Sequence, residues 1–209
     1  MVFVLGWLAQ PAAAQQKKSI SFTHFLDDTF VPESIRDVNW MDDGQYYTTL
    51  ERTEDDIELR KYDILTGDYE VIVATTELRV PGRRRPIIMQ GYQFSVDEQK
   101  ILLKTDVERI WRRSTRENYY VYDIQSGDIT KLTESDQKQQ YAQLSPSGNK
   151  AAFVQDNDLF LVNLQTGEEK AITTDGAHNK IINGAADWVY EEEFGIAKAW
   201  YWSPDGEEI

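Results

Sequence analysis

The fold is decided by residues 144–168, which read LSPSGNKAAFVQDNDLFLVNLQTGE. A small polar turn, LSPSG, opens this stretch, and two largely apolar runs, residues 150–155 and 158–163, follow it. Runs rich in apolar, β-branched or aromatic residues and bounded by turn residues are typical of β-strands. A second turn, NLQTGE, closes the stretch, and its glycine supplies the positive φ that a tight hairpin requires. The stretch therefore predicts two antiparallel strands between two turns.

Both turns recur along the chain. Turns of the first kind are WMDDG (40–44), FSVDE (94–98), LSPSG (144–148) and WSPDG (202–206). Turns of the second kind are DILTGD (63–68), DIQSGD (123–128) and NLQTGE (163–168). Short strands that repeat with a period of about 40–50 residues indicate β-propeller blades of four antiparallel strands. Similar turns in a β-sandwich are the alternative.

The number of repeats predicts an all-β fold in which the propeller is incomplete. Three repeats are whole, and a fourth stops at Ile209, just after its first turn, so about three and a half blades are present. A closed propeller needs roughly four to eight blades. We therefore expect the front part of a longer protein. We also expect the unfinished repeat to expose the apolar faces of Trp200 and Trp202.

The composition excludes several functions. The chain has 36 acidic and 22 basic residues and a net charge of −14, which argues against binding to nucleic acid or to anionic lipid. It contains no cysteine and two histidines, so disulfides, thiolate metal sites and a cysteine nucleophile are excluded. We expect no metal and no cofactor. No apolar run reaches the roughly 20 residues of a membrane-spanning helix.

The first residues resemble a targeting signal. The apolar run VFVLGWL (2–8) is followed by PAAAQ (11–15), which predicts a secretory signal peptide over residues 1–14. A buried N-terminal strand is the alternative. We then expect a lead-in segment over residues 15–34 and a partial β-propeller over residues 35–209. An exported protein without cysteine suits the bacterial envelope, in the periplasm or secreted.

Two long excursions interrupt the repeats, over residues 106–118 (DVERIWRRSTREN) and 174–199. The second contains DWVYEEEF (187–194), where Asp187 is a suitable N-cap for a short helix. Successive helical residues point about 100° apart, so two of the three glutamates can face one pocket. Clustered carboxylates repel one another unless a metal, an arginine or a ligand ammonium joins them. A solvated acidic helix start is the alternative.

These motifs resemble the dipeptidyl peptidase IV group of the prolyl oligopeptidase-type serine peptidases. The resemblance rests on DWVYEEEF (187–194) before WSPDG (202–206), on WRRS (111–114) before YYVYD (119–123), and on SI (34–35) before VNWM (38–41). It covers nearly all of the chain after the expected signal. It implies an eight-bladed propeller on an α/β-hydrolase domain, which we expect C-terminal to residue 209.

The resemblance also implies roles for three residues. In the family, two glutamates bind the N-terminal ammonium of the substrate and an arginine contacts a backbone carbonyl. These residues correspond to Glu192, Glu193 and Arg112. The implied activity releases Xaa-Pro or Xaa-Ala dipeptides from peptides with a free N-terminus. The resemblance also implies that the full-length protein can be a homodimer, although the segments usually responsible are not in this chain.

No catalytic residue is expected in this chain. The nucleophile motif Gly-x-Ser-x-Gly is absent from the sequence, and neither His24 nor His178 has the context of a catalytic triad. The chain alone should therefore not hydrolyse peptides. The alternative function is a non-enzymatic propeller that binds protein partners in the cell envelope. A glycosidase is disfavoured, because adjacent helical glutamates do not straddle a glycosidic bond.

The predicted signal peptide has a direct test. If Ala14 is the last residue of a cleaved signal, N-terminal sequencing of the exported protein should begin at or near Gln15. Intact Met1 on cytosolic protein would contradict the prediction.

Overall fold

The computed structural model describes residues 19–31 and 38–209, and the predicted signal peptide and residues 34–35 lie outside these ranges. The chain divides into two compact units, Met1–Ile35 and Arg36–Ile209. In the first unit, two short 3₁₀ helices follow one another, η1 (Phe22–Phe25) and η2 (Asp28–Phe30). The second unit contains all the strands found within the described residues.

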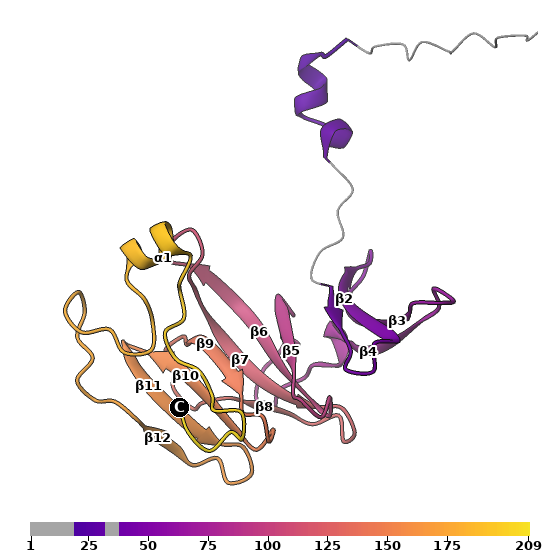
Figure 1. Ribbon diagram of the computed structural model, residues 1–209. Coiled ribbons are helices and arrows are strands. Elements are labelled where there is room, and N and C mark those ends of the chain that lie inside the picture. Colours follow the sequence, from indigo (N-terminus) through magenta and orange to yellow (C-terminus); the bar gives the residue numbers. More distant parts are fainter. Residues whose placement is uncertain (1–18, 32–37) are drawn as a thin grey trace, which may run out of the picture. The chain divides into compact units, whose positions relative to one another are not determined.

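The second unit contains three four-stranded antiparallel sheets, each built from strands that are consecutive in the sequence (Figure 1). The first sheet consists of β1 (Asn39–Trp40), β2 (Tyr46–Arg52), β3 (Ile57–Asp63) and β4 (Tyr69–Ala74), followed by the 3₁₀ helix η3 (Thr75–Glu77). The second consists of β5 (Gly91–Phe94), β6 (Lys100–Arg109), β7 (Thr115–Asp123) and β8 (Ile129–Lys131). The third consists of β9 (Gln140–Leu144), β10 (Lys150–Gln155), β11 (Asp158–Asn163) and β12 (Glu169–Ala171). The predicted strands 150–155 and 158–163 are thus confirmed.

The second kind of turn has one hydrogen-bonding pattern in all three sheets. In the second sheet, Asp123 Oδ1 accepts from the main-chain N–H groups of Gln125 (3.1 Å) and Ser126 (3.0 Å), and Gly127 has a φ of 75°. Asp63 and Asn163 make the same contacts in their own sheets. The side chain thereby replaces a main-chain acceptor, which is why Asp or Asn begins each turn.

The first kind of turn also repeats, and it extends into the fourth repeat. Ser95 Oγ donates to Asp97 Oδ1 at 2.6 Å and accepts from the N–H of Lys100. Ser203 Oγ donates to Asp205 Oδ1, also at 2.6 Å, and accepts from the N–H of Glu208. The fourth repeat therefore has the same turn, although no strand is assigned to it within the described residues.

The core lies between successive sheets. On β6, Ile101 and Leu103 are buried against the first sheet, in a cluster that includes Leu59 and Val73. Leu102, between them in sequence, belongs to a second cluster with Phe153 of the third sheet. Because alternate residues of a strand point to opposite faces, the second sheet buries both of its faces. This stacking is what blades of a propeller require.

The segment that follows the third sheet corrects one expectation. Trp200 is only 5% exposed and packs against Ala152, Val154 and Leu159, which form the outer face of the third sheet. Trp202 packs against the same cluster and is partly buried. The prediction that both indoles have exposed apolar faces is therefore wrong, because the third sheet already supplies a surface that covers them.

Asp158, the first residue of β11, organises the long connection that begins after β12. Its Oδ1 accepts hydrogen bonds from Thr173 Oγ1 (2.7 Å), Gly176 N–H (3.0 Å) and Asn183 Nδ2 (3.1 Å). Burial alone would raise the pKa of Asp158, but these hydrogen bonds outweigh it and the pKa lies below its ordinary value. One carboxylate thus holds the connection against the third sheet.

The connection contains the one α-helix of the described residues, α1 (Trp188–Phe194), which lies beside the outer end of the β6–β7 hairpin (Figure 1). Within residues 19–31 and 38–209, no helix is long and apolar enough to cross a membrane.

Removing the Asp158 carboxylate should destabilise the protein. Asp158→Ala leaves three donors without their acceptor, so the free energy of unfolding at neutral pH should fall by on the order of 1.5–3 kcal/mol. The pKa of Asp158 is lower in the folded than in the unfolded state, so its stabilisation is lost as the pH falls below about 4. Urea unfolding should therefore show a smaller difference from wild type under acid conditions.

Asp136→Ala is the matched control, since Asp136 is exposed and its side chain makes no hydrogen bond within the described residues. It should leave the free energy of unfolding nearly unchanged. An equal loss in both variants, or a loss in Asp158→Ala that does not shrink in acid, would contradict the assignment.

Candidate functional site

The hairpin that joins β6 to β7 carries Arg112 away from the sheet core. Its register shifts between Thr105 and Glu108, where Asp106 has a positive φ of 54°. Beyond the shift, Glu108 pairs with Arg116 across the hairpin, with an Oε1–Nη2 distance of 2.5 Å. The pairing continues to residues 109 and 115, so the turn that contains Arg112 is held at the end of a regular ladder.

Helix α1 begins after Asp187, the N-cap that its sequence predicts. Asp187 is the N-cap, and its Oδ1 accepts from the N–H of Tyr190 at 3.0 Å. Gly195 ends the helix in the left-handed conformation, with a φ of 68°. The segments on either side of the helix pair with each other, since the N–H of Ala186 donates to the carbonyl of Ala197 at 2.9 Å. The helix is therefore fixed at both of its ends.

Glu191 joins the helix to the hairpin. Its side chain is buried, with the residue only 1% exposed. Its Oε1 accepts from the main-chain N–H groups of Arg113 (2.5 Å) and Ser114 (3.0 Å), which are 78 and 77 residues away in sequence. Burial would raise the pKa of Glu191, but hydrogen bonds from Ser114 and from the main chain of Arg113 outweigh it and lower the pKa. The carboxylate is therefore ionised at neutral pH.

The negative charge of Glu191 affects the pKa of a neighbouring tyrosine, Tyr141. Burial, followed by the negative charge of Glu191, raises the pKa of Tyr141 to about 12. Tyr141 belongs to β9 of the third sheet. The phenol therefore stays neutral beside the Glu191 carboxylate.

The outer surface of this junction brings two of the three predicted binding residues together. Arg112 Nη1 lies 3.2 Å from Glu192 Oε2, and the Glu192 side chain is 15% exposed whereas that of Arg112 is 72% exposed. Glu193, next on the helix, is exposed and forms no ion pair with any described residue. The structure therefore supplies an arginine paired with one carboxylate and, one helical position further on, a second carboxylate.

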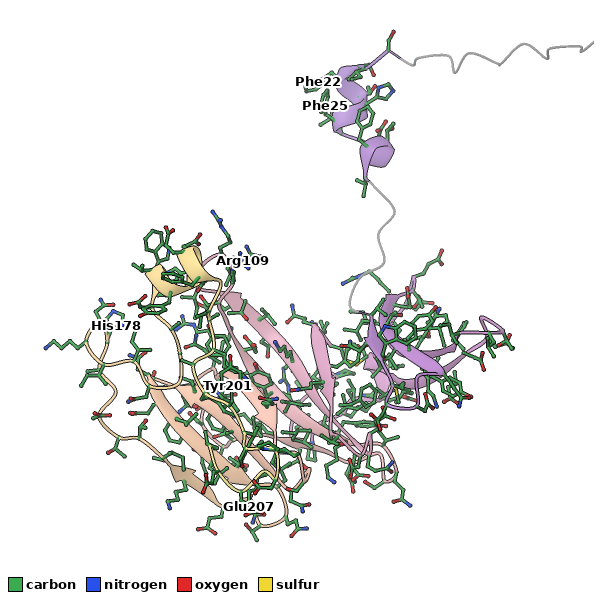
Figure 2. The ribbon with its side chains drawn as sticks, viewed as in Figure 1. Phe22, Phe25, Arg109, His178, Tyr201 and Glu207 are labelled. Atoms are coloured by element: carbon green, nitrogen blue, oxygen red, sulfur yellow. The ribbon has the colours of Figure 1, made fainter. Side chains whose placement is uncertain are left out.

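Helix α1 and the hairpin turn also carry aromatic side chains that are exposed to solvent. Trp188, Tyr190 and Phe194 on α1 are each at least half exposed, and Trp111 on the hairpin is 39% exposed. Figure 2 shows Arg109, at the end of β6, beside the same helix. A cavity of about 480 Å³ lies elsewhere, between the second and third sheets, and none of the predicted binding residues lines it.

This arrangement suits binding of a small cation better than bond cleavage. Two carboxylates beside a partly exposed arginine can accept charge-assisted hydrogen bonds from an ammonium, while the guanidinium donates to a carbonyl. Among the described residues, no group of three or more His, Asp or Glu side chains is placed to hold a metal ion. His24 belongs to η1, in the first of the two units, and His178 is exposed in the connection before α1.

The resemblance assigns no role to Glu191, the first of the three consecutive glutamates. The structure shows that it faces inward and binds the hairpin. The spacing of about 100° per residue indicates that one of three consecutive glutamates must differ in direction. Nothing local in the sequence indicates its partner, because the two main-chain donors lie in another blade.

Comparisons with known proteins agree with this fold. A family model described as the dipeptidyl peptidase IV N-terminal region matches residues 95–209. Prolyl endopeptidase FAP of Mus musculus is 32% identical over 191 residues, which are 91% of this chain and 24% of that protein. Dipeptidyl peptidase 4 of Trichophyton rubrum is 36% identical over 178 residues, which are 84% of this chain and 21% of that protein.

One solved structure covers the same region. The crystal structure of Porphyromonas gingivalis dipeptidyl peptidase 4 is similar with a TM-score of 0.80 and 33% identity, over 91% of this chain and 27% of that one. The predicted propeller blades are thus confirmed by a related structure as well as by the three sheets. The chain spans about a quarter of the length of these relatives. The chain therefore belongs to the family of dipeptidyl peptidase IV N-terminal regions.

Proposed function

We propose that this chain is the substrate-recognition part of an exported serine exopeptidase that releases Xaa-Pro or Xaa-Ala dipeptides from peptide N-termini. The observation that carries the proposal is the ion pair between Arg112 and Glu192, with Glu193 beside it. Arg112 and Glu192 come from different excursions, 80 residues apart in the chain, and the ion pair brings them together. Membership of the dipeptidyl peptidase IV family supports the same function.

The substrate ammonium would bind between Glu192 and Glu193. An ammonium has three donors and no acceptor, so two carboxylates can satisfy most of its hydrogen bonds. Contacts of this kind are stronger than those between neutral groups. In the free protein Glu192 is already paired with Arg112. An arriving ammonium would share that carboxylate and free part of the guanidinium to donate to a substrate carbonyl.

Fixing the amino end of the peptide would set the position of cleavage. A bond two residues from the ammonium would always meet the catalytic groups at the same distance, which lowers the barrier by orientation. Those groups are not supplied by the site described above, and the Gly-x-Ser-x-Gly motif does not occur in the sequence. We place the nucleophile, its acid and base partners and the oxyanion donors in an α/β-hydrolase domain C-terminal to residue 209.

Export to the cell envelope belongs to the same proposal. The A-x-A pattern that ends at Ala14 supports it. Peptides with a free N-terminus are the substrates that such an enzyme would meet there. Assay of the full-length protein against free-amine Xaa-Pro substrates tests the activity. Lack of dipeptide release by correctly folded full-length protein would favour a non-enzymatic propeller that binds protein partners.

The ammonium site has a sharper test in the full-length protein. Glu192→Gln and Glu193→Gln each keep the shape of the side chain but remove one charge that faces the substrate. Each should lower kcat/KM for a free-amine Xaa-Pro substrate by about 10- to 150-fold, the loss of one charge-assisted contact. The N-acetylated substrate has no ammonium, so wild type should process it poorly and the variants should not lower its turnover further.

Two further variants complete that experiment. Arg112→Ala should weaken turnover of both substrates, because the carbonyl that it would bind is present in each. Glu54→Gln is the control, since Glu54 is exposed in the loop after β2, and it should change neither. Wild-type turnover of the free-amine substrate by both glutamate variants would show that the assignment is wrong.

A further inference from the structure

The candidates for a positioning role are the buried charged groups near Arg112, and Glu191 is the one whose contacts bridge the two excursions. Its Oε1 accepts from the N–H of Arg113, the residue that follows Arg112. Glu191 itself precedes Glu192, the partner of Arg112. A single hydrogen-bonded contact therefore joins the immediate neighbours of both members of the ion pair.

We propose that Glu191 is a positioning residue whose buried carboxylate fastens the Arg112 hairpin to helix α1 and so sets the geometry of the binding site. The effect on turnover rests on the proposed function given above, whereas the contact itself does not. Glu191 does not touch the substrate in this proposal. It acts through Arg112, by fixing where the hairpin turn lies relative to Glu192.

The ion pair alone is too weak to do this. The Arg112 side chain is 72% exposed, and exposed ion pairs contribute little because water screens them and the long side chain loses freedom. The Glu191 carboxylate is 1% exposed, and its hydrogen bonds use two rigid main-chain donors. Buried hydrogen bonds to a charged acceptor are stronger and leave two costly unpaired donors when they are broken. Glu191 is therefore the contact that determines the position of the hairpin.

The helix has its own supports and does not need the hairpin. Asp187 caps its first turn, and the segments that flank it pair through Ala186 and Ala197. The hairpin turn beyond Arg109 is closed by hydrogen bonds from Ile110 and Trp111 to the carbonyl of Ser114, which lie within the turn itself. Loss of the Glu191 contact should therefore release the hairpin turn, with Arg112, and leave Glu192 and Glu193 in place.

Hydrogen exchange in the full-length protein tests the contact directly. In Glu191→Ala, the amide protons of Arg113 and Ser114 should exchange at least about tenfold faster than in wild type, because they lose their acceptor. Amides of Tyr120 and Val121, in the body of β7, should keep their rates. Glu193→Ala is the matched control and should leave the exchange of Arg113 and Ser114 unchanged. Unchanged exchange in folded Glu191→Ala would overturn the proposal, whatever the protein catalyses.

A double-mutant cycle tests the effect on turnover. Glu191→Ala should lower kcat/KM for a free-amine Xaa-Pro substrate by about tenfold or more, and Glu191→Gln, which keeps an acceptor oxygen, should lose less. Combined with Arg112→Ala, Glu191→Ala should cause little further loss, because both changes remove the same contact to the substrate. Additive losses would show that Glu191 does not act through Arg112, and would overturn the proposal.

The experiments also distinguish a variant that fails to fold from a failure of the proposed function. If Glu191→Ala does not fold, Glu191→Met, which keeps the length of the side chain but has no oxygen acceptor, replaces it in the exchange experiment. Faster exchange at Arg113 and Ser114 then supports the proposal, and unchanged exchange overturns it. If the wild-type protein releases no dipeptide, the proposed function fails, and the exchange measurement still decides whether Glu191 fastens the hairpin.

Discussion

The structure depends on the burial of both faces of each internal sheet. Ile101 and Leu103 of β6 face the first sheet while Leu102 faces the third, so one strand contributes to two cores. Apolar burial of this kind is the dominant favourable term in folding. The predicted binding residues Arg112, Glu192 and Glu193 accordingly lie in the excursions beyond the sheet ends, outside these cores.

Polar contacts made by two carboxylates hold the excursions to the sheets. Asp158 ties the connection before α1 to the third sheet, and Glu191 ties α1 to the second. Both carboxylates have a pKa below the ordinary value, because their hydrogen bonds outweigh the cost of burial. The Glu191 contact holds the hairpin beside helix α1, and Arg112 and Glu192 form their ion pair on the outer side of this junction. In the proposed function, the substrate is bound by loops that charged side chains fasten to the sheets.

The repeats were predictable from the sequence because their signals are local. A turn that begins with Asp123 and contains Gly127 is closed by hydrogen bonds within a few residues, and the same residue types recur wherever the turn does. Asp187 was predictable as a cap for the same reason. The position of Trp200 and the task of Glu191 were not, since each is determined by contacts with a different sheet. Residue types alone left the glutamates open to interpretation as a solvated helix start, and the resemblance to a family selected Arg112, Glu192 and Glu193.

The central claim is that the two excursions together form a site for the N-terminus of a peptide. A crystal structure of the full-length protein with an Xaa-Pro dipeptide tests it most directly. The account predicts the dipeptide ammonium within hydrogen-bonding distance of the carboxylates of Glu192 and Glu193, with the Arg112 guanidinium donating to a dipeptide carbonyl. A dipeptide bound with its ammonium away from both glutamates would contradict the account.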